Sequence, residues 1–110
     1  MTIEYDDFDK VDIRVGTVTD VEDFPRARKP AYRLTVDFGP EIGERRTSVQ
    51  VTTYAKEEIH GMQVVAVVNF APKRIAGFPS EVLVLGAMDE QKGVVLLEPD
   101  DDVEPGARIG

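Results

Sequence analysis

Side chains that could bind anions are concentrated in two loops of this 110-residue chain. Segment 70–80 contains Lys73 and Arg74 and no acidic residue, and segment 24–36 is likewise basic and free of acids. Ammonium and guanidinium groups bind phosphates and carboxylates, so both segments indicate recognition of an anionic partner. The alternative is that these cations only solvate turns. The candidate cations in the loops are Arg26, Arg28, Lys29, Lys73 and Arg74.

The rest of the chain is acidic, with a net charge of −8. Residues 1–23 contain eight acidic side chains, and residues 89–104 contain seven. An acidic total disfavours nucleic acid, because phosphate contacts supply most non-specific affinity. The local distribution of charge is more informative than the sum, and it leaves the middle of the chain basic.

Uncharged side chains near the two basic segments could add to a binding surface. Asn69 ends an apolar run, where its amide could either satisfy a loop backbone or reach a ligand, and both readings stay open. Phe78 lies between a glycine and a proline, so we expect it to be accessible for stacking or for holding an apolar group. Tyr32 and Phe70 fall in strand patterns, and we expect both to pack in the core.

Signals for enzymatic chemistry are weak. The single histidine, His60, stands beside Gly61 at a predicted helix end, where it is expected to cap carbonyl groups. No serine–histidine–carboxylate spacing and no phosphate-cradling glycine motif is visible. The acidic run 100–104 lacks the alternating spacing and the glycine of a calcium loop. We therefore predict no catalysis, no metal site and no cofactor.

Composition predicts one globular domain over residues 1–110. The chain is 42% hydrophobic and 31% charged, and it contains no cysteine, which fits a reducing compartment. The acidic N-terminus does not resemble a secretory signal, and no apolar run approaches the roughly 20 residues that span a bilayer. We expect a cytoplasmic protein without membrane insertion.

Apolar periodicity predicts mainly short strands. A phase change at Gly16, after the first strand, predicts a bulge or sharp bend there. A short helix is expected to begin after Thr53 and to be closed by Gly61. The predicted strands are Val11–Val15, Tyr32–Phe38, Arg45–Thr52 (with Thr52 facing outward), Val64–Val68, Val82–Leu85 and Val94–Leu97, and the predicted helix is Tyr54–His60.

Three strands, one short helix and two further strands match a five-stranded Greek-key barrel, the OB-fold. We therefore predict an all-β protein with one short helix. In that fold, the loops joining strands one to two and four to five flank the ligand face. Here those loops are Phe24–Pro30 and Ala71–Ser80, which carry the basic side chains. The prolines and glycine of the second loop predict that it is not itself strand.

Several motifs along the chain together carry a family resemblance. They are Phe8–Gly16, Val36–Gly39, Val67–Arg74, Gly77–Ser80 and Pro105–Gly106. They resemble the tRNA-binding domain family, with a match over residues 8–110. The resemblance implies an OB-fold whose N- and C-terminal extensions build a homodimer, and it implies no catalysis. It also implies that Asn69, Lys73, Arg74 and Ser80 contribute to ligand contact.

Other segments look like the CsaA export-related chaperone branch of that family. They are Glu41–Gly43, Ser80–Gly86 and Val94–Pro99. The tRNA-binding members usually continue this serine as Ser-x-Gly-Met, whereas Glu81 and Val82 follow Ser80 in this chain. Their third strand carries Ser-Gly-Ile, where this chain has Ser48-Val-Gln. These departures favour the chaperone branch.

The first hypothesis is therefore a homodimeric, non-enzymatic CsaA-like chaperone. It would bind unfolded or exported precursor polypeptides through a basic, aromatic-lined groove, with export machinery as a further partner. The alternative is a tRNA-binding module that contacts RNA through the same loops. For either ligand the predicted site residues are Arg26, Arg28, Lys29, Asn69, Lys73, Arg74, Phe78 and Ser80.

Overall fold

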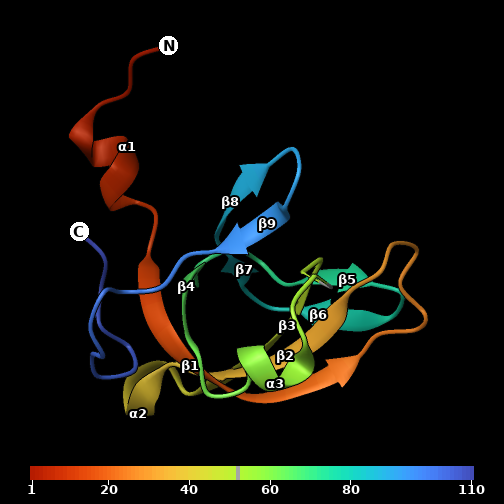
Figure 1. The fold of residues 1–110 in the computed structure, drawn as a ribbon. Coiled ribbons are helices and arrows are strands. Elements are labelled where there is room, and N and C mark those ends of the chain that lie inside the picture. Colours follow the sequence, from red (N-terminus) through yellow and green to blue (C-terminus); the bar gives the residue numbers. More distant parts are fainter. Residues whose placement is uncertain (52) are drawn as a thin grey trace.

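The computed structural model describes residues 1–51 and 53–110, and within them strands predominate (Figure 1). Thr52, which we predicted at the end of the third strand, lies outside the described residues. The elements are α1 (Tyr5–Asp9), β1 (Ile13–Asp23), β2 (Tyr32–Asp37), α2 (Gly39–Ile42), β3 (Glu44–Val49), α3 (Lys56–Ile59), β4 (Gln63–Val67), β5 (Lys73–Ile75), β6 (Phe78–Ser80), β7 (Leu83–Val84), β8 (Gly86–Asp89) and β9 (Gly93–Leu96).

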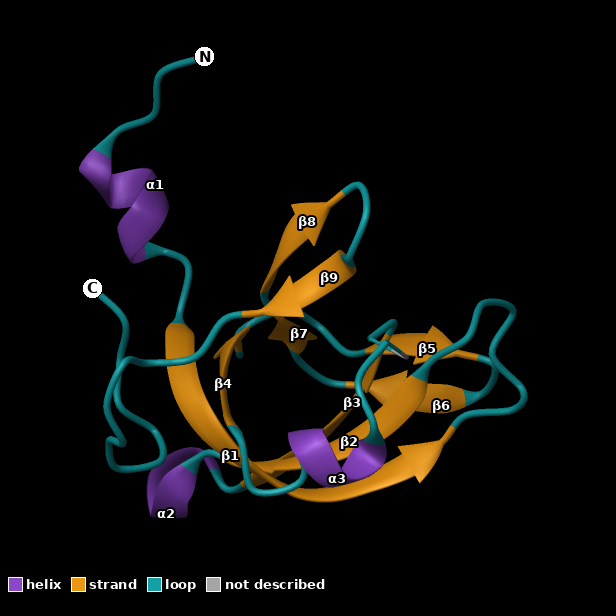
Figure 2. Ribbon diagram, viewed as in Figure 1, coloured by secondary structure: helices purple, strands orange, loops and turns teal. Residues whose placement is uncertain are grey.

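Five antiparallel strands form the central sheet, in the order β3-β2-β1-β4-β7. The sheet curls into a nearly closed barrel, with α3 covering one opening (Figure 2). The predicted OB-fold is confirmed. Its core lies inside the barrel and includes the fully buried side chains of Leu34, Val36 and Phe38. Burying each such side chain contributes about 1.5–3 kcal/mol.

Strand β1 is long enough to pair with two different strands, β4 and β2. Its first half pairs with β4 and its second half with β2, with a register shift between Val18 and Asp20. The predicted irregularity at Gly16 is therefore misplaced by a few residues. Gly16 is needed for close packing instead, because an added Cβ would lie 2.5 Å from Val36 and 2.7 Å from the Phe38 ring.

Polar contacts join β3 to the segment before β7 and nearly close the barrel. Glu81 donates its backbone N–H to the carbonyl of Arg46 over 2.8 Å, and its carboxylate accepts the N–H of Arg46, also at 2.8 Å. The buried hydroxyl of Thr47 donates to the Val82 carbonyl at 2.8 Å. Glu81, which the sequence marked as a departure from the tRNA-binding pattern, thus takes part in the closure.

The predicted loop 71–80 is a β-hairpin, so the prediction of no strand was wrong. Ala76 and Gly77 both have positive φ, 49° and 80°, which is the geometry of a tight hairpin turn. Pro79 pairs with Arg74 within this separate two-stranded sheet. A proline is tolerated there because an edge strand does not need every N–H. The loop therefore presents its cations from a short, regular support.

Helices also differ from the prediction. The helix α3 starts at Lys56 rather than Tyr54, and Glu58 accepts the N–H of Ala55 at 2.7 Å. Tyr54 is used in tertiary contacts: its hydroxyl accepts the N–H of Leu96, and its carbonyl accepts the hydroxyl of Tyr32. The short helices α1 and α2 were not predicted, because neither contains a buried apolar stripe.

The chain ends extend beyond the barrel. Residues 106–109 run along the free edge of β1, with the Gly106 N–H donating to Val15 and the Ile109 N–H to Ile13. The helix α1 projects away from the barrel and has no buried residue (Figure 1). The hairpin β8–β9 protrudes on the same side, and its first strand was not predicted. Among the described residues, no helix is long and apolar enough to cross a membrane.

Candidate functional site

The two basic loops lie side by side at one end of the barrel (Figure 1). Their contact is an aromatic pair: the rings of Phe24 and Phe78 meet edge to face, with centroids 5.4 Å apart. Both rings are buried in a small cluster with Ala31, separate from the barrel core. This cluster fixes the first loop, 24–31, against the hairpin β5–β6. We call the two loops together the loop end.

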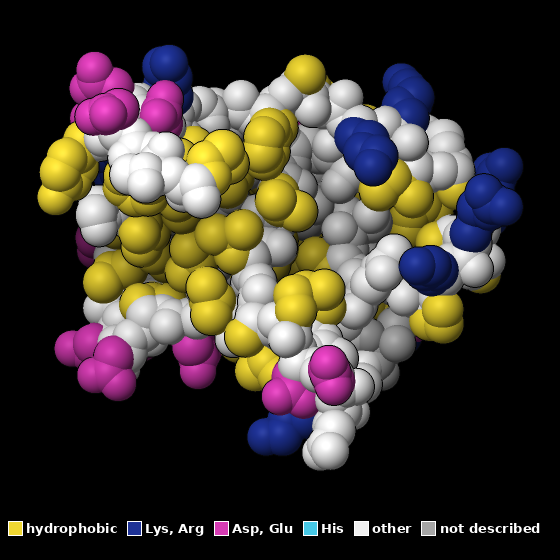
Figure 3. All heavy atoms as spheres, turned by 90° about the horizontal axis from the view of Figure 1, so that it is seen from above, with side chains coloured by type: hydrophobic (Ala, Val, Ile, Leu, Met, Phe, Trp, Pro, Cys, Tyr) yellow, Lys and Arg dark blue, Asp and Glu magenta, His cyan; other side chains and the backbone are white. Residues whose placement is uncertain are grey.

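The predicted cations of the loop end are all exposed. Arg26, Arg28 and Lys29 project from the first loop, and Lys73 and Arg74 from the hairpin. Arg74 also donates to the Gly77 carbonyl at 2.8 Å, which braces the hairpin turn. In the space-filling view, several Lys and Arg side chains gather over this end, while the acidic side chains visible on this face lie on the opposite side and along the lower margin (Figure 3).

The aromatic lining differs from the prediction. Phe78 is only 7% exposed, so the prediction of an accessible Phe78 was wrong; Phe24 covers its ring from the first loop. Phe70 is 56% exposed, so its predicted core position was also wrong, because the chain leaves the sheet at the end of β4. Tyr32 packs against the core as predicted. Phe70 is therefore the accessible aromatic residue beside the hairpin.

Phe70 lines a hollow of about 480 Å³ between the hairpin and the barrel. Leu83 contributes a half-exposed apolar side chain to its wall, and Lys73 lies at its margin. A second hollow of about 370 Å³ continues from it along the gap between β3 and β7. An apolar floor with a few polar groups is the usual character of a ligand site. We call the first hollow the Phe70 pocket.

Two arginines on the outer face of the sheet complete the loop end. Arg33 on β2 and Arg46 on β3 both stack on the buried aromatic pair, with guanidinium carbons 4.8–5.6 Å from the ring centroids. Glu22 on β1 forms ion pairs with both, at 3.8 Å to Arg33 and 3.3 Å to Arg46. Strand alternation predicts this placement, because Arg33 and Arg46 are direct neighbours of Leu34 and Thr47, which face the barrel interior.

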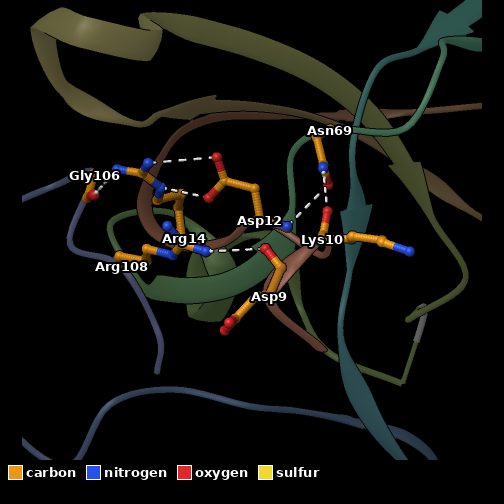
Figure 4. Close-up of polar contacts among 7 residues, drawn as sticks. All are labelled: Asp9, Lys10, Asp12, Arg14, Asn69, Gly106 and Arg108. Carbon is orange, nitrogen blue, oxygen red and sulfur yellow. Dashed lines mark hydrogen bonds and ion pairs between the residues drawn. The ribbon is translucent and has the colours of Figure 1, made fainter. Parts of the chain in front are cut away.

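The side chain of Asn69 forms hydrogen bonds to the backbone of this chain (Figure 4). Its Oδ1 accepts the N–H of Asp12 at 2.9 Å, and its Nδ2 donates to the Lys10 carbonyl at 2.7 Å. Of the two readings left open for this amide, the structure therefore favours backbone support. Asn69 links the end of β4 to the segment between α1 and β1.

Ser80 is likewise engaged within the fold. Its hydroxyl lies 3.0 Å from that of Thr47 and accepts the N–H of Ser48 at 3.2 Å. Ser80 therefore supports the strands beside the loop end and Asn69 supports the segment before β1, whereas the cations of the loop end are exposed.

Charged side chains also hold the two chain ends (Figure 4). Arg14 donates to Asp12 over 2.6 Å, and this hydrogen bond lowers the pKa of the Asp12 carboxyl below its ordinary value. The same guanidinium donates to the Gly106 carbonyl, and Arg108 donates to the Asp9 carbonyl at 3.3 Å. These contacts fix the orientation of α1 and of the C-terminal segment.

The side of the barrel that carries α1 and β8–β9 exposes a group of apolar side chains, which charged side chains border (Figure 3). Met88 is 84% exposed on β8, and Tyr5 is 89% exposed on α1. We call this side the terminal face. Its other exposed apolar side chains are Met1, Ile3, Phe8 and Leu97.

Metal-binding groups are not clustered in the described part of the chain. Across residues 1–51 and 53–110, no group of three or more histidine, aspartate or glutamate side chains is placed to hold a metal ion. His60 ends α3, and its backbone N–H donates to the Lys56 carbonyl at 3.0 Å.

Comparison with solved structures finds CsaA chaperone proteins. The CsaA chaperone of Picrophilus torridus is 52% identical, with a TM-score of 0.95 over 99% of this chain and 100% of that one. The CsaA chaperone of Bacillus anthracis strain Ames is 50% identical, with a TM-score of 0.94 over the whole of both chains. The resemblance seen in the sequence is therefore confirmed.

Curated relatives include aminoacyl-tRNA synthetases. The methionine–tRNA ligase of Methanosarcina acetivorans is 39% identical over 107 residues, which cover 97% of this chain and 15% of the ligase. The chain thus spans only about a seventh of the length of such relatives. A family model described as "Putative tRNA binding domain" matches residues 13–108. The chain belongs to the tRNA-binding domain family.

Proposed function

We propose that this chain is a non-catalytic, chaperone-type module that binds unfolded or precursor polypeptides at the loop end, with residues 1–110 acting as one unit. The observation that carries the proposal is the Phe70 pocket, in which an exposed aromatic side chain and Leu83 lie next to the exposed Lys73. The similarity to CsaA chaperones over the whole chain supports the same function.

The chemistry of the loop end suits an extended polypeptide. An apolar side chain of the client enters the Phe70 pocket and removes its surface from water. Acidic side chains of the client then face Lys73 and the cations of the first loop. Because exposed ion pairs contribute little, the apolar contact supplies most of the affinity and the charges supply preference among clients.

A tRNA-binding module is the second candidate. The family model and the cations shared by both loops favour it. Two observations weigh against tight RNA binding: the net charge is −8, and Glu81 places a carboxylate beside the Phe70 pocket. Phosphates would be repelled by both.

We further propose that the terminal face joins two copies of this chain. Large exposed apolar areas on a folded protein usually mark an interface with a partner. The helix α1 and the hairpin β8–β9 contribute its exposed side chains. A two-fold symmetric dimer formed through this face would have two loop ends, one in each copy.

A salt titration separates the two ligands. Binding of fluorescein-labelled, reduced α-lactalbumin and of a labelled tRNA transcript is measured by anisotropy between 50 and 500 mM NaCl. We expect polypeptide binding to persist near 150 mM, while any tRNA binding falls steeply as counterions are released. Folded, native α-lactalbumin is the control, because it exposes no unfolded segment for the module to bind. Retention of tRNA at 150 mM NaCl, without binding of reduced α-lactalbumin, would contradict the proposal.

A further inference from the structure

The carboxylate of Glu22 occupies a position where an incoming anion could bind. It lies between the guanidinium groups of Arg33 and Arg46, 3.8 Å from the first and 3.3 Å from the second. All three side chains remain between about a third and a half exposed. An exposed ion pair of this kind contributes little to stability, so another carboxylate can replace it at small cost.

The two arginines are held in place independently of Glu22. Buried rings of Phe24 and Phe78 lie beneath the Arg33 guanidinium, and Phe78 also lies beneath that of Arg46. Stacking of this kind fixes the plane of the guanidinium group. If Glu22 swings away, both guanidinium groups therefore keep their orientation toward solvent.

Arg33 also has donor capacity that the protein leaves unused. Its ion pair with Glu22, at 3.8 Å, is longer than a hydrogen bond, so this contact leaves the exposed part of the guanidinium able to donate to a ligand. The Nε itself is buried, has no hydrogen-bond partner among the described residues and lies out of a ligand's reach. The same side chain lines a hollow of about 300 Å³ between the two loops, together with Arg26. A ligand group can therefore approach the guanidinium from this hollow.

We infer that Arg33 and Arg46 form a carboxylate-binding subsite for an aspartate or glutamate side chain of the bound polypeptide, and that Glu22 acts as an internal competitor for it. The inference rests on the proposed polypeptide binding and specifies its client. The group that occupies the subsite in the free protein is a carboxylate, which argues for a carboxylate rather than a phosphate ligand. Clients with an acidic residue close to an apolar one are then preferred.

The test uses two labelled peptides with amidated ends, identical except that two central glutamates in one are glutamines in the other. Anisotropy is measured with the wild-type chain, Glu22→Gln, Arg46→Gln and the control Glu41→Gln. Glu41 lies exposed on α2, far from the loop end, so its variant changes net charge alone.

We expect Glu22→Gln to raise affinity for the glutamate peptide about threefold or more and to leave the glutamine peptide unchanged. Arg46→Gln should abolish the wild-type preference for the glutamate peptide, and Glu41→Gln should change neither affinity. Equal effects of Glu22→Gln on both peptides, or no effect on either, would overturn the subsite while leaving polypeptide binding intact. The same would follow if Glu22→Gln strengthened only tRNA binding. Failure of both peptides to bind the wild-type chain would instead refute polypeptide binding itself, and the subsite with it.

Discussion

The loop end and the terminal face are built in opposite ways. At the loop end, an apolar cluster around Phe24 and Phe78 lies inside, and the charged side chains lie outside. At the terminal face, polar contacts of Asn69 and Arg14 hold the chain ends, and large apolar side chains such as Met88 are exposed. Hydrated charged groups suit a ligand that binds reversibly, whereas an exposed apolar area suits a stable interface with a partner.

The largest expected effect on this difference between the two regions comes from disrupting the buried aromatic pair of the loop end. Phe78→Ala should lower the free energy of unfolding by about 3–5 kcal/mol, because it removes a buried ring that joins the two loops. Phe70→Ala is the matched control and should cost less than about 1 kcal/mol, since that ring is more than half exposed. Urea denaturation measures both. Equal losses would show that the two rings do not differ in burial.

The terminal face can be tested through oligomeric state. Met88→Asp places a charge among the exposed apolar side chains of the proposed interface and should raise the dimer dissociation constant at least about tenfold. Ala76→Asp adds the same charge at the loop end, in a left-handed conformation that aspartate tolerates, and should leave the dimer intact. Sedimentation velocity at micromolar concentration measures both. A wild-type monomer under these conditions would remove the proposed interface.

Asn69 distinguishes support of the chain end from ligand contact. Asn69→Ala removes two hydrogen bonds to the backbone of Lys10 and Asp12 and should cost about 1–2 kcal/mol of stability. Amide exchange at Asp12 should accelerate as its acceptor is lost. Unchanged stability combined with weaker ligand binding would assign Asn69 to the ligand instead.

The smallest expected effect concerns pH. The hydrogen bond from Arg14 lowers the pKa of Asp12 in the folded state, so its stabilisation is present above the ordinary value of about 3.9 and is lost as pH falls through the lowered one. Asp12→Asn should therefore be less stable than the wild type at pH 7, by about 0.2–1 kcal/mol because the pair is partly exposed. Thermal unfolding at pH 7 and pH 2.5 checks this. A difference that persists undiminished at pH 2.5 would exclude the charge of Asp12 as its cause.

Local patterns in the sequence were sufficient to predict the barrel and the position of its two basic loops. Alternation along residues 32–38 predicted a half-buried strand, and the order of elements then placed the two loops at one end. Charge counts needed no structure at all, and the exposed cations lie where the counts indicated.

Exposure of single aromatic residues could not be predicted in the same way. Phe78 is buried because Phe24, far away in the sequence, packs against it, and no local pattern reports such a contact. Phe70 is exposed because the chain leaves the sheet after Val67, which an apolar run continuing to Val68 conceals. The hairpin was missed because proline was taken to exclude strand, although edge strands accept it.

Charge reversal at the loop end and at the terminal face tests most directly the claim that polypeptides bind at the loop end. Arg28→Glu with Lys73→Glu alters both loops of the loop end, and Lys10→Glu with Lys92→Glu makes the same change in charge near the terminal face. Affinity for reduced α-lactalbumin at 150 mM NaCl is measured for both double variants. We predict a loss of about tenfold for the first and less than about twofold for the second. Equal losses in the two variants would contradict a binding site at the loop end.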